Sequence, residues 1–191
     1  LPYAQVPGFI TELRQIEADP ASKLAFEFLI LTATRTNEAI KAKWPEIDFE
    51  ARTWTVPAER MKAKRAHCIP LPARCMAILE EARKLSGGKG YIFPGRAKGK
   101  PLSQMVFLMM LRRMGHDVTA HGFRSSFRDW AAERTNFPRE VCESALAHTL
   151  KDKTEAAYKR TTLLDKRRDL MGQWAAFATQ QKGKVINLKS A

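Results

Sequence analysis

The pattern of apolar and polar positions predicts a mainly helical chain. Residues 21–33 form a long, strongly apolar run, sufficient for a buried helix. Residues 73–85 and 164–180 repeat apolar side chains every three or four positions, as expected of helices with one buried face. Shorter helices are expected over residues 11–18, 38–44, 103–114 and 138–147, with Ser103 capping one and Pro138 beginning another.

The pattern changes to that of short strands near the middle of the chain. Residues 53–56 and 67–71 flank the basic stretch ERMKAKRA, an arrangement that predicts a hairpin with a polar loop. The segment YIFP, residues 91–94, is expected to supply a third strand. The predicted fold class is therefore α+β, mainly α-helical with a small three-stranded antiparallel sheet.

Composition narrows the class of partner. The 191 residues fit one domain, and a hydrophobic content of 45% is enough for a core. Thirty-three Lys and Arg against twenty Asp and Glu give a net charge of +13, which indicates a polyanionic partner. DNA or RNA is the first candidate and an acidic membrane surface the alternative, although no apolar run approaches the roughly 18 residues of a membrane span.

The three cysteines and four histidines give no sign of a cofactor. The cysteines lack the CxxC spacing of a zinc site, and their odd number indicates reduced thiols of the cytoplasm rather than a disulfide framework. No metal-ligand cluster stands out along the chain. We therefore expect neither a metal nor a cofactor.

Two groups of polar residues in the first half could carry chemistry. Arg35 follows the apolar helix directly, with Glu38 three residues later, and an ordinary surface ion pair is the alternative reading. Lys62 and Lys64 lie in the predicted hairpin loop, where a solvated basic turn is the default. Such a loop also suits a lysine that enters a DNA groove or protonates a leaving group.

Two further groups lie in the second half. His121 and Arg124, in HGFRSSFRDW, are three residues apart and would offer an imidazole and a forked guanidinium to one phosphate. His148 and Tyr158 are ten residues apart in ALAHTLKDKTEAAYKR. A tyrosine is a poor nucleophile because its ordinary pKa of about 10 leaves it protonated at neutral pH. A catalytic tyrosine therefore needs nearby cations, and alone it would be a packing or surface residue.

Taken in order, these residues resemble the catalytic domain of tyrosine recombinases, specifically the integrases of prophages and genomic islands. LTATRTNE is similar to the family's first box, HGFR to its histidine-x-x-arginine box, and LAH and AAYKR to its last one. The family's loop lysine lies eight residues before a proline, and counting back from Pro70 selects Lys62 over Lys64. The resemblance implies a catalytic set of Arg35, Lys62, His121, Arg124, His148 and Tyr158, with Glu38 in support.

The sequence departs from the family pattern at three positions. Ala33 and Asn37 stand where glycines are common in the first box, and Ala147 replaces the usual glycine before the histidine. None is a catalytic position, so these departures concern turn geometry rather than chemistry.

The resemblance implies a DNA strand exchange without metal or ATP. Tyr158 would attack the scissile phosphate, forming a 3′-phosphotyrosyl bond and releasing a 5′-hydroxyl. Arg35 and Arg124 would hold the non-bridging oxygens, and Lys62 would protonate the departing 5′-oxygen. His121 would take the phenolic proton or share a phosphate contact, and His148 would hydrogen-bond the phosphate or the tyrosine.

The resemblance also implies a domain arrangement and partners. We expect a catalytic domain over residues 1–182 and a tail over residues 183–191 that packs in cis or against a neighbouring subunit. Arm-binding and core-binding domains would precede this chain. The expected partners are attachment-site double-stranded DNA, sister subunits in a tetramer on DNA (a monomer in isolation is the alternative) and DNA-bending or directionality factors. No membrane is expected, and the location would be the bacterial cytoplasm, at the nucleoid.

Two other functions fit parts of the same pattern. A non-catalytic basic module would bind DNA in a salt-dependent way without using Tyr158. A type IB topoisomerase would share the nucleophile and the cations, and would relax DNA without site preference.

Overall fold

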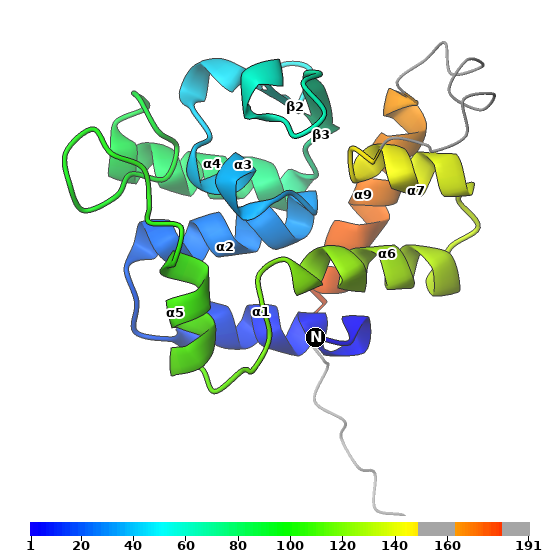
Figure 1. The fold of residues 1–191 in the computed structure, drawn as a ribbon, viewed down its shortest axis with the longest axis horizontal. Coiled ribbons are helices and arrows are strands. Elements are labelled where there is room, and N and C mark those ends of the chain that lie inside the picture. The colour runs from blue at the N-terminus through cyan, green and yellow to red at the C-terminus, as the bar shows by residue number, and fades with distance from the viewer. Residues whose placement is uncertain (149–162, 181–191) are drawn as a thin grey trace, which may run out of the picture.

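In the computed structural model, which describes residues 1–148 and 163–180, helix α2 (Pro20–Thr32) is the central element (Figure 1). It packs against α1 (Val6–Gln15), α4 (Ala73–Ser86) and α9 (Leu164–Ala178). Ten residues of α2 are buried, as its strongly apolar sequence predicted. Helix α2 therefore lies at the centre of the hydrophobic core.

Local sequence sets both ends of α2. The Asp19 carboxylate accepts a hydrogen bond from the backbone N–H of Ser22 at 2.8 Å, and Pro20 occupies the first turn, where its missing N–H is not needed. The helix ends at Ala33, whose φ of 49° is left-handed. This turn leads the chain into the short helix α3 (Thr36–Ile40).

The sheet has three antiparallel strands in the order β1-β2-β3, which confirms the predicted fold class. The strands are β1 (Ile47–Asp48), β2 (Thr53–Val56) and β3 (His67–Pro70). Trp54 pairs with Ile69 across the β2–β3 hairpin, and both side chains are buried. The sheet and α1 lie on opposite sides of α2 (Figure 1).

The predicted third strand was placed wrongly. Residues 91–94 contribute only to isolated bridges, Lys43–Tyr91 and Pro94–Pro101, and the third strand is β1 instead. The backbone N–H of Ile92 donates to the Ala42 carbonyl at 2.9 Å, and the side chains of Ile92 and Phe93 are buried in the core. The apolar character of this segment reflects core packing rather than ladder pairing.

Three of the predicted shorter helices lie elsewhere than expected. α3 covers Thr36–Ile40 rather than residues 38–44. α1 begins at Val6 rather than at residue 11, because Pro7 is accommodated in its first turn. The helix predicted from Ser103 is α5 (Val106–Arg113). The Ser103 hydroxyl accepts a hydrogen bond from the Met105 N–H at 3.2 Å in the turn before the helix.

Helix α6 (Gly122–Arg134) and helix α7 (Arg139–Ala145) pack against each other and against α9 (Figure 1). Pro138 directly precedes α7 rather than beginning it. Trp130 of α6 and Trp174 of α9 have ring centroids 5.2 Å apart. This aromatic packing fixes α6, which carries one of the predicted arginines, against the core.

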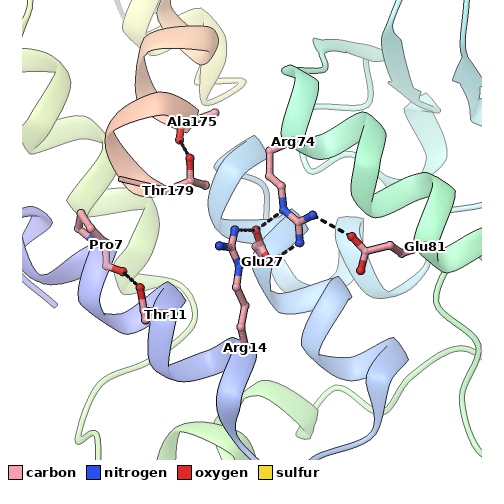
Figure 2. Close-up of polar contacts among 8 residues, drawn as sticks. All are labelled: Pro7, Thr11, Arg14, Glu27, Arg74, Glu81, Ala175 and Thr179. Atoms are coloured by element: carbon pink, nitrogen blue, oxygen red, sulfur yellow. Dashed lines mark hydrogen bonds and ion pairs between the residues drawn. The ribbon is translucent and has the colours of Figure 1, made fainter. Parts of the chain in front are cut away.

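A buried carboxylate joins three helices (Figure 2). Glu27 of α2 is only 2% exposed and forms ion pairs with Arg14 of α1 and Arg74 of α4. Arg74 also contacts Glu81, at 2.8 Å. Burial raises the pKa of Glu27, but the hydrogen bonds from Arg74 and Arg14 outweigh it and lower the pKa overall, so the carboxylate is charged at neutral pH.

No helix within residues 1–148 and 163–180 has both the length and the apolar character needed to cross a membrane.

Candidate active site

Arg35 and Glu38 form a rigid pair at the start of α3. Glu38 is 3% exposed, and its carboxylate accepts hydrogen bonds from both the backbone N–H and the Nη1 of Arg35, each at 2.9 Å. The ion pair that was the alternative reading of the sequence is present, but its carboxylate is buried rather than at the surface. Glu38 is thus occupied in holding Arg35, whose guanidinium remains partly exposed beside an open pocket.

Arg124 is held by the backbone. Its side chain projects from α6, and the residue is only 4% exposed. Nη1 donates to the carbonyl of Ala33 and Nη2 to the carbonyl of Leu146, the latter at 2.8 Å. Burial, followed by the charge of Arg35, lowers the pKa of Arg124 to about 10, which leaves the group cationic at neutral pH.

His148 lies against Arg124. Its Nε2 atom is 3.3 Å from Nη2 of Arg124, and its Nδ1 atom is 2.7 Å from Oε2 of Glu143. His148 is exposed, at the end of the turn that follows α7. The structure therefore brings the second predicted histidine to the second predicted arginine.

His121 occupies the residue before α6 and is exposed. Partial burial lowers its pKa, and the positive charges of Arg124 and Arg35 lower it further. A histidine whose pKa is depressed is neutral at physiological pH and can accept a proton. The position and charge environment of His121 thus suit a proton acceptor.

An open pocket of about 440 Å³ connects the first half of the site to His121. Both Lys62 and Lys64 line it and are exposed, so the geometry keeps both lysines as candidates. Within the described ranges, no group of three His, Cys, Asp or Glu side chains is arranged to hold a metal. The pocket is lined by Arg35, Thr36, Asn37, Glu38, Arg60, Met61, Lys62, Lys64 and His121.

Tyr158, the predicted nucleophile, lies outside the described residues, as does the predicted tail over residues 183–191. The other five predicted catalytic residues are all described. They fall into two neighbouring groups, one of Arg35, Lys62 and His121 around the pocket and the other of Arg124 and His148. The two groups adjoin, because Arg124 donates to the carbonyl of Ala33, two residues before Arg35, and its backbone N–H donates to the His121 carbonyl at 3.0 Å.

The structure adds three side chains that the sequence did not indicate. Arg60 donates to the Glu38 carbonyl at 3.2 Å and pairs with Glu46, which ties the hairpin to α3. His67 of β3 has its Nε2 atom 3.3 Å from the Ala145 carbonyl, at the end of α7. Glu143 contacts His148, and its position five residues earlier gave no helical spacing signal.

Two fixed arginines, two histidines and accessible lysines converge here, an arrangement suited to binding and activating a phosphodiester. Comparison with known proteins agrees: residues 1–163 match the sequence pattern of the phage integrase family. The chain belongs to that family.

Relatives extend this assignment. The chain is 38% identical over 174 residues to the prophage integrase IntA of Escherichia coli K12, covering 90% of this chain and 42% of IntA. It is 31% identical over 206 residues to the integrase of Enterobacteria phage P4, covering 98% and 47% of the two chains. The chain thus spans less than half the length of these relatives.

Solved structures with lower identity share the fold. An integrase from mycobacterium phage Brujita superposes with a TM-score of 0.64 at 20% identity, over 92% of this chain and 63% of that one. The XerH site-specific recombinase, bound to its difH substrate in a pre-cleavage complex, gives a TM-score of 0.62 at 18% identity, over 84% and 52%. The helical fold with its small sheet is therefore that of site-specific recombinases.

Proposed function

We propose that this chain is the catalytic domain of a site-specific DNA recombinase, which cuts and rejoins DNA through a 3′-phosphotyrosyl intermediate. The observation that carries the proposal is the convergence of Arg124 and His148 with the pocket that Arg35 and His121 line. Membership in the phage integrase family supports it. In such a protein the reaction integrates or excises a mobile element, such as a prophage or genomic island.

The proposed cleavage step exchanges one phosphodiester for another. The Tyr158 oxygen attacks the scissile phosphorus and displaces the 5′-oxygen of the next nucleotide. His121 accepts the phenolic proton, since its depressed pKa keeps it neutral. Lys62 donates a proton to the departing oxygen. The phosphotyrosyl bond conserves the free energy of the broken bond, so a 5′-hydroxyl can attack it in reverse and reseal the strand.

Arg35 and Arg124 stabilise the charge that develops on the non-bridging oxygens. Glu38 fixes the first guanidinium, and two backbone carbonyls fix the second. Donors that are already in place cost little reorganisation during the reaction. Loss of one such donor typically costs about 2.7–4 kcal/mol of transition-state stabilisation.

The wider assembly belongs to the same proposal. Double-stranded DNA carrying attachment sites is the substrate, and the net charge of +13 supports a polyanionic partner. XerH, a structural neighbour, is described as bound to its difH substrate. We also propose a catalytic domain over residues 1–182, preceded by DNA-binding domains, a tetramer on DNA, accessory bending or directionality factors, and action at the bacterial nucleoid.

Covalent capture tests this proposal. The intact protein is incubated with attachment-site DNA that is nicked next to the cleavage position, so that the short released strand diffuses away and the adduct accumulates. We expect a protein–DNA adduct that is absent with Tyr158→Phe and strongly reduced with Arg35→Ala. An adduct that persists in Tyr158→Phe overturns the assigned nucleophile.

The same assay separates the alternatives. Salt-dependent DNA binding without any adduct from the wild-type protein would identify a non-catalytic DNA-binding module. Relaxation of supercoiled plasmids that lack the attachment site would identify a topoisomerase. Either outcome contradicts the recombinase proposal.

A further inference from the structure

Glu143 and Arg128 form a chain of contacts that ends at His148. The Nε atom of Arg128, on α6, donates to Oε1 of Glu143, on α7, at 2.7 Å. The other carboxylate oxygen, Oε2, is 2.7 Å from Nδ1 of His148. The backbone N–H of His148 also donates to the Glu143 carbonyl at 2.9 Å. One residue therefore holds both the main chain and the ring of His148.

The charges of the groups around His148 determine which of its ring nitrogens carries the proton. Burial raises the pKa of Glu143, but the hydrogen bonds from His148 and Arg128 outweigh it and lower the pKa overall. Glu143 is therefore ionised at neutral pH, and an ionised carboxylate only accepts hydrogen bonds. It follows that Nδ1 of His148 carries a proton and donates it to Glu143.

The other ring nitrogen of His148, Nε2, faces the guanidinium of Arg124, which can only donate hydrogen bonds. Nε2 of His148 is 3.3 Å from Nη2 of Arg124, and a guanidinium has no acceptor. Nε2 therefore presents its lone pair at Arg124. Together the two contacts select the neutral imidazole with its proton on Nδ1. The second possible tautomer would place a lone pair against a carboxylate and a proton against a guanidinium.

Arg128 makes this arrangement rigid. Glu143 is only 16% exposed in its side chain, and Arg128 occupies the carboxylate oxygen that His148 does not use. A carboxylate with both oxygens engaged cannot rotate away from the histidine without breaking a second ion pair. The orientation of His148 is therefore set by α6 and α7 together.

We propose that Glu143, held by Arg128, is a positioning residue that fixes the tautomer and the orientation of His148, so that Nε2 faces the site beside Arg124 as a hydrogen-bond acceptor. This inference rests on the proposed recombinase function for its catalytic consequence. Its structural part, the tautomer, stands independently of that function.

The tautomer is measured first, without DNA. Two-bond ¹⁵N–¹H correlation spectra of the ¹⁵N-histidine-labelled protein report which ring nitrogen of His148 is protonated, and His148→Asn assigns the signal. We expect a protonated Nδ1 in the wild type. We expect the same in the control variant Glu140→Gln, since Glu140 is an exposed carboxylate of the same helix. We expect a tautomer mixture in Glu143→Ala. A wild-type ring protonated only at Nε2, or an unchanged signal in Glu143→Ala, overturns the proposal.

Cleavage is measured next, as the first-order rate of adduct formation at saturating attachment-site DNA. We expect Glu143→Ala to lose up to about a hundredfold in rate with DNA affinity unchanged, since misplacement of a reacting group by about 1 Å can cost that much. Glu143→Gln keeps an acceptor oxygen and should recover part of the rate. In a His148→Asn background, Glu143→Ala should add no further loss.

The controls distinguish positioning from simple stabilisation. A merely structural Glu143 predicts a lower melting temperature with wild-type cleavage per folded molecule and an unchanged tautomer, and this result overturns the proposal. Equal, additive losses in the wild-type and His148→Asn backgrounds overturn it as well. If the wild-type protein forms no adduct, the recombinase proposal fails, whereas the tautomer measurement still decides the Glu143 contact.

Discussion

The Nη1 atom of Arg124 donates a hydrogen bond to the carbonyl of Ala33, a residue 91 positions earlier in the chain. Ala33 has a left-handed backbone, with φ of 49°. The second acceptor of Arg124 is the Leu146 carbonyl, and the next residue, Ala147, is also left-handed, with φ of 50°. Two strained turns therefore present the carbonyls that fix the buried arginine.

Replacing Ala147 with glycine should stabilise the protein. A non-glycine residue in the left-handed region costs about 1–2 kcal/mol. Glycine removes that cost, but its greater freedom in the unfolded chain lowers the stability of the folded protein by about 0.4–1 kcal/mol. We expect Ala147→Gly to raise the free energy of unfolding by about 0.5–1 kcal/mol in urea titrations. Ala33→Gly should gain less, because its methyl group is buried. Lower stability in Ala147→Gly would contradict the assigned strain.

Glu27 should be essential to stability, whereas its neighbour Glu81 should not be. Glu27→Gln leaves Arg14 and Arg74 without their shared carboxylate in a mostly buried position (Figure 2). Removing one partner of a buried pair costs about 3–5 kcal/mol, and the partial exposure of both arginines reduces this to about 2–3 kcal/mol.

Glu81→Gln is the matched control for that substitution. It removes a carboxylate from the same arginine, but the Glu81 side chain is 49% exposed, and the loss should stay below about 1 kcal/mol. Both free energies are obtained from urea titrations at pH 7. Equal losses in the two variants would show that the buried carboxylate has no special role.

His67 should make the protein sensitive to mild acid. Burial, followed by the charge of Arg167, lowers the pKa of His67 from 6.5 to about 4. The unfolded chain therefore binds a proton at His67 near pH 6.5, while the folded protein resists it until about pH 4. The contribution of His67 is fully present above pH 6.5 and is lost as the pH falls toward 4.

A substitution isolates this effect. His67→Gln keeps a donor for the Ala145 carbonyl but cannot titrate. Between pH 7 and pH 5 the wild-type protein should lose about 2 kcal/mol more stability than His67→Gln, at about 1.4 kcal/mol per pH unit below 6.5. This window lies above the titration of Glu27, whose pKa is lowered from 4.5. Urea titrations at several pH values measure the difference, and parallel pH curves would refute it.

Much of this fold follows from periodicity. The apolar run of α2 and the three- and four-residue spacing of α4 and α9 predict helices within one or two residues of their observed bounds. Local patterns failed where tertiary packing decides the conformation. Ile92 and Phe93 look like strand residues, but their side chains fill the core between two isolated bridges.

The site was predicted less completely than the fold. The short motifs LTATRTNE and HGFR indicated Arg35 and Arg124, because each motif lies within a few consecutive residues. The Glu143–Arg128 contact joins α7 to α6, and the His67–Ala145 contact joins β3 to α7. Such pairs depend on how elements pack, which no single stretch of sequence encodes.

Lys62 and Lys64 line the same pocket, so a chemical test must choose between them. A general acid contributes about 10²–10⁴ in rate, and Lys62→Ala should lose that much cleavage while Lys64→Ala loses mainly DNA affinity. A DNA substrate with sulfur in place of the departing 5′-oxygen needs no general acid, because thiols ionise near pH 8.5. This substrate should restore cleavage by Lys62→Ala to within about tenfold of the wild type. It should leave Arg35→Ala impaired, because in the proposed mechanism Arg35 contacts oxygens that do not depart. Rescue of Lys64→Ala instead would assign the acid to Lys64.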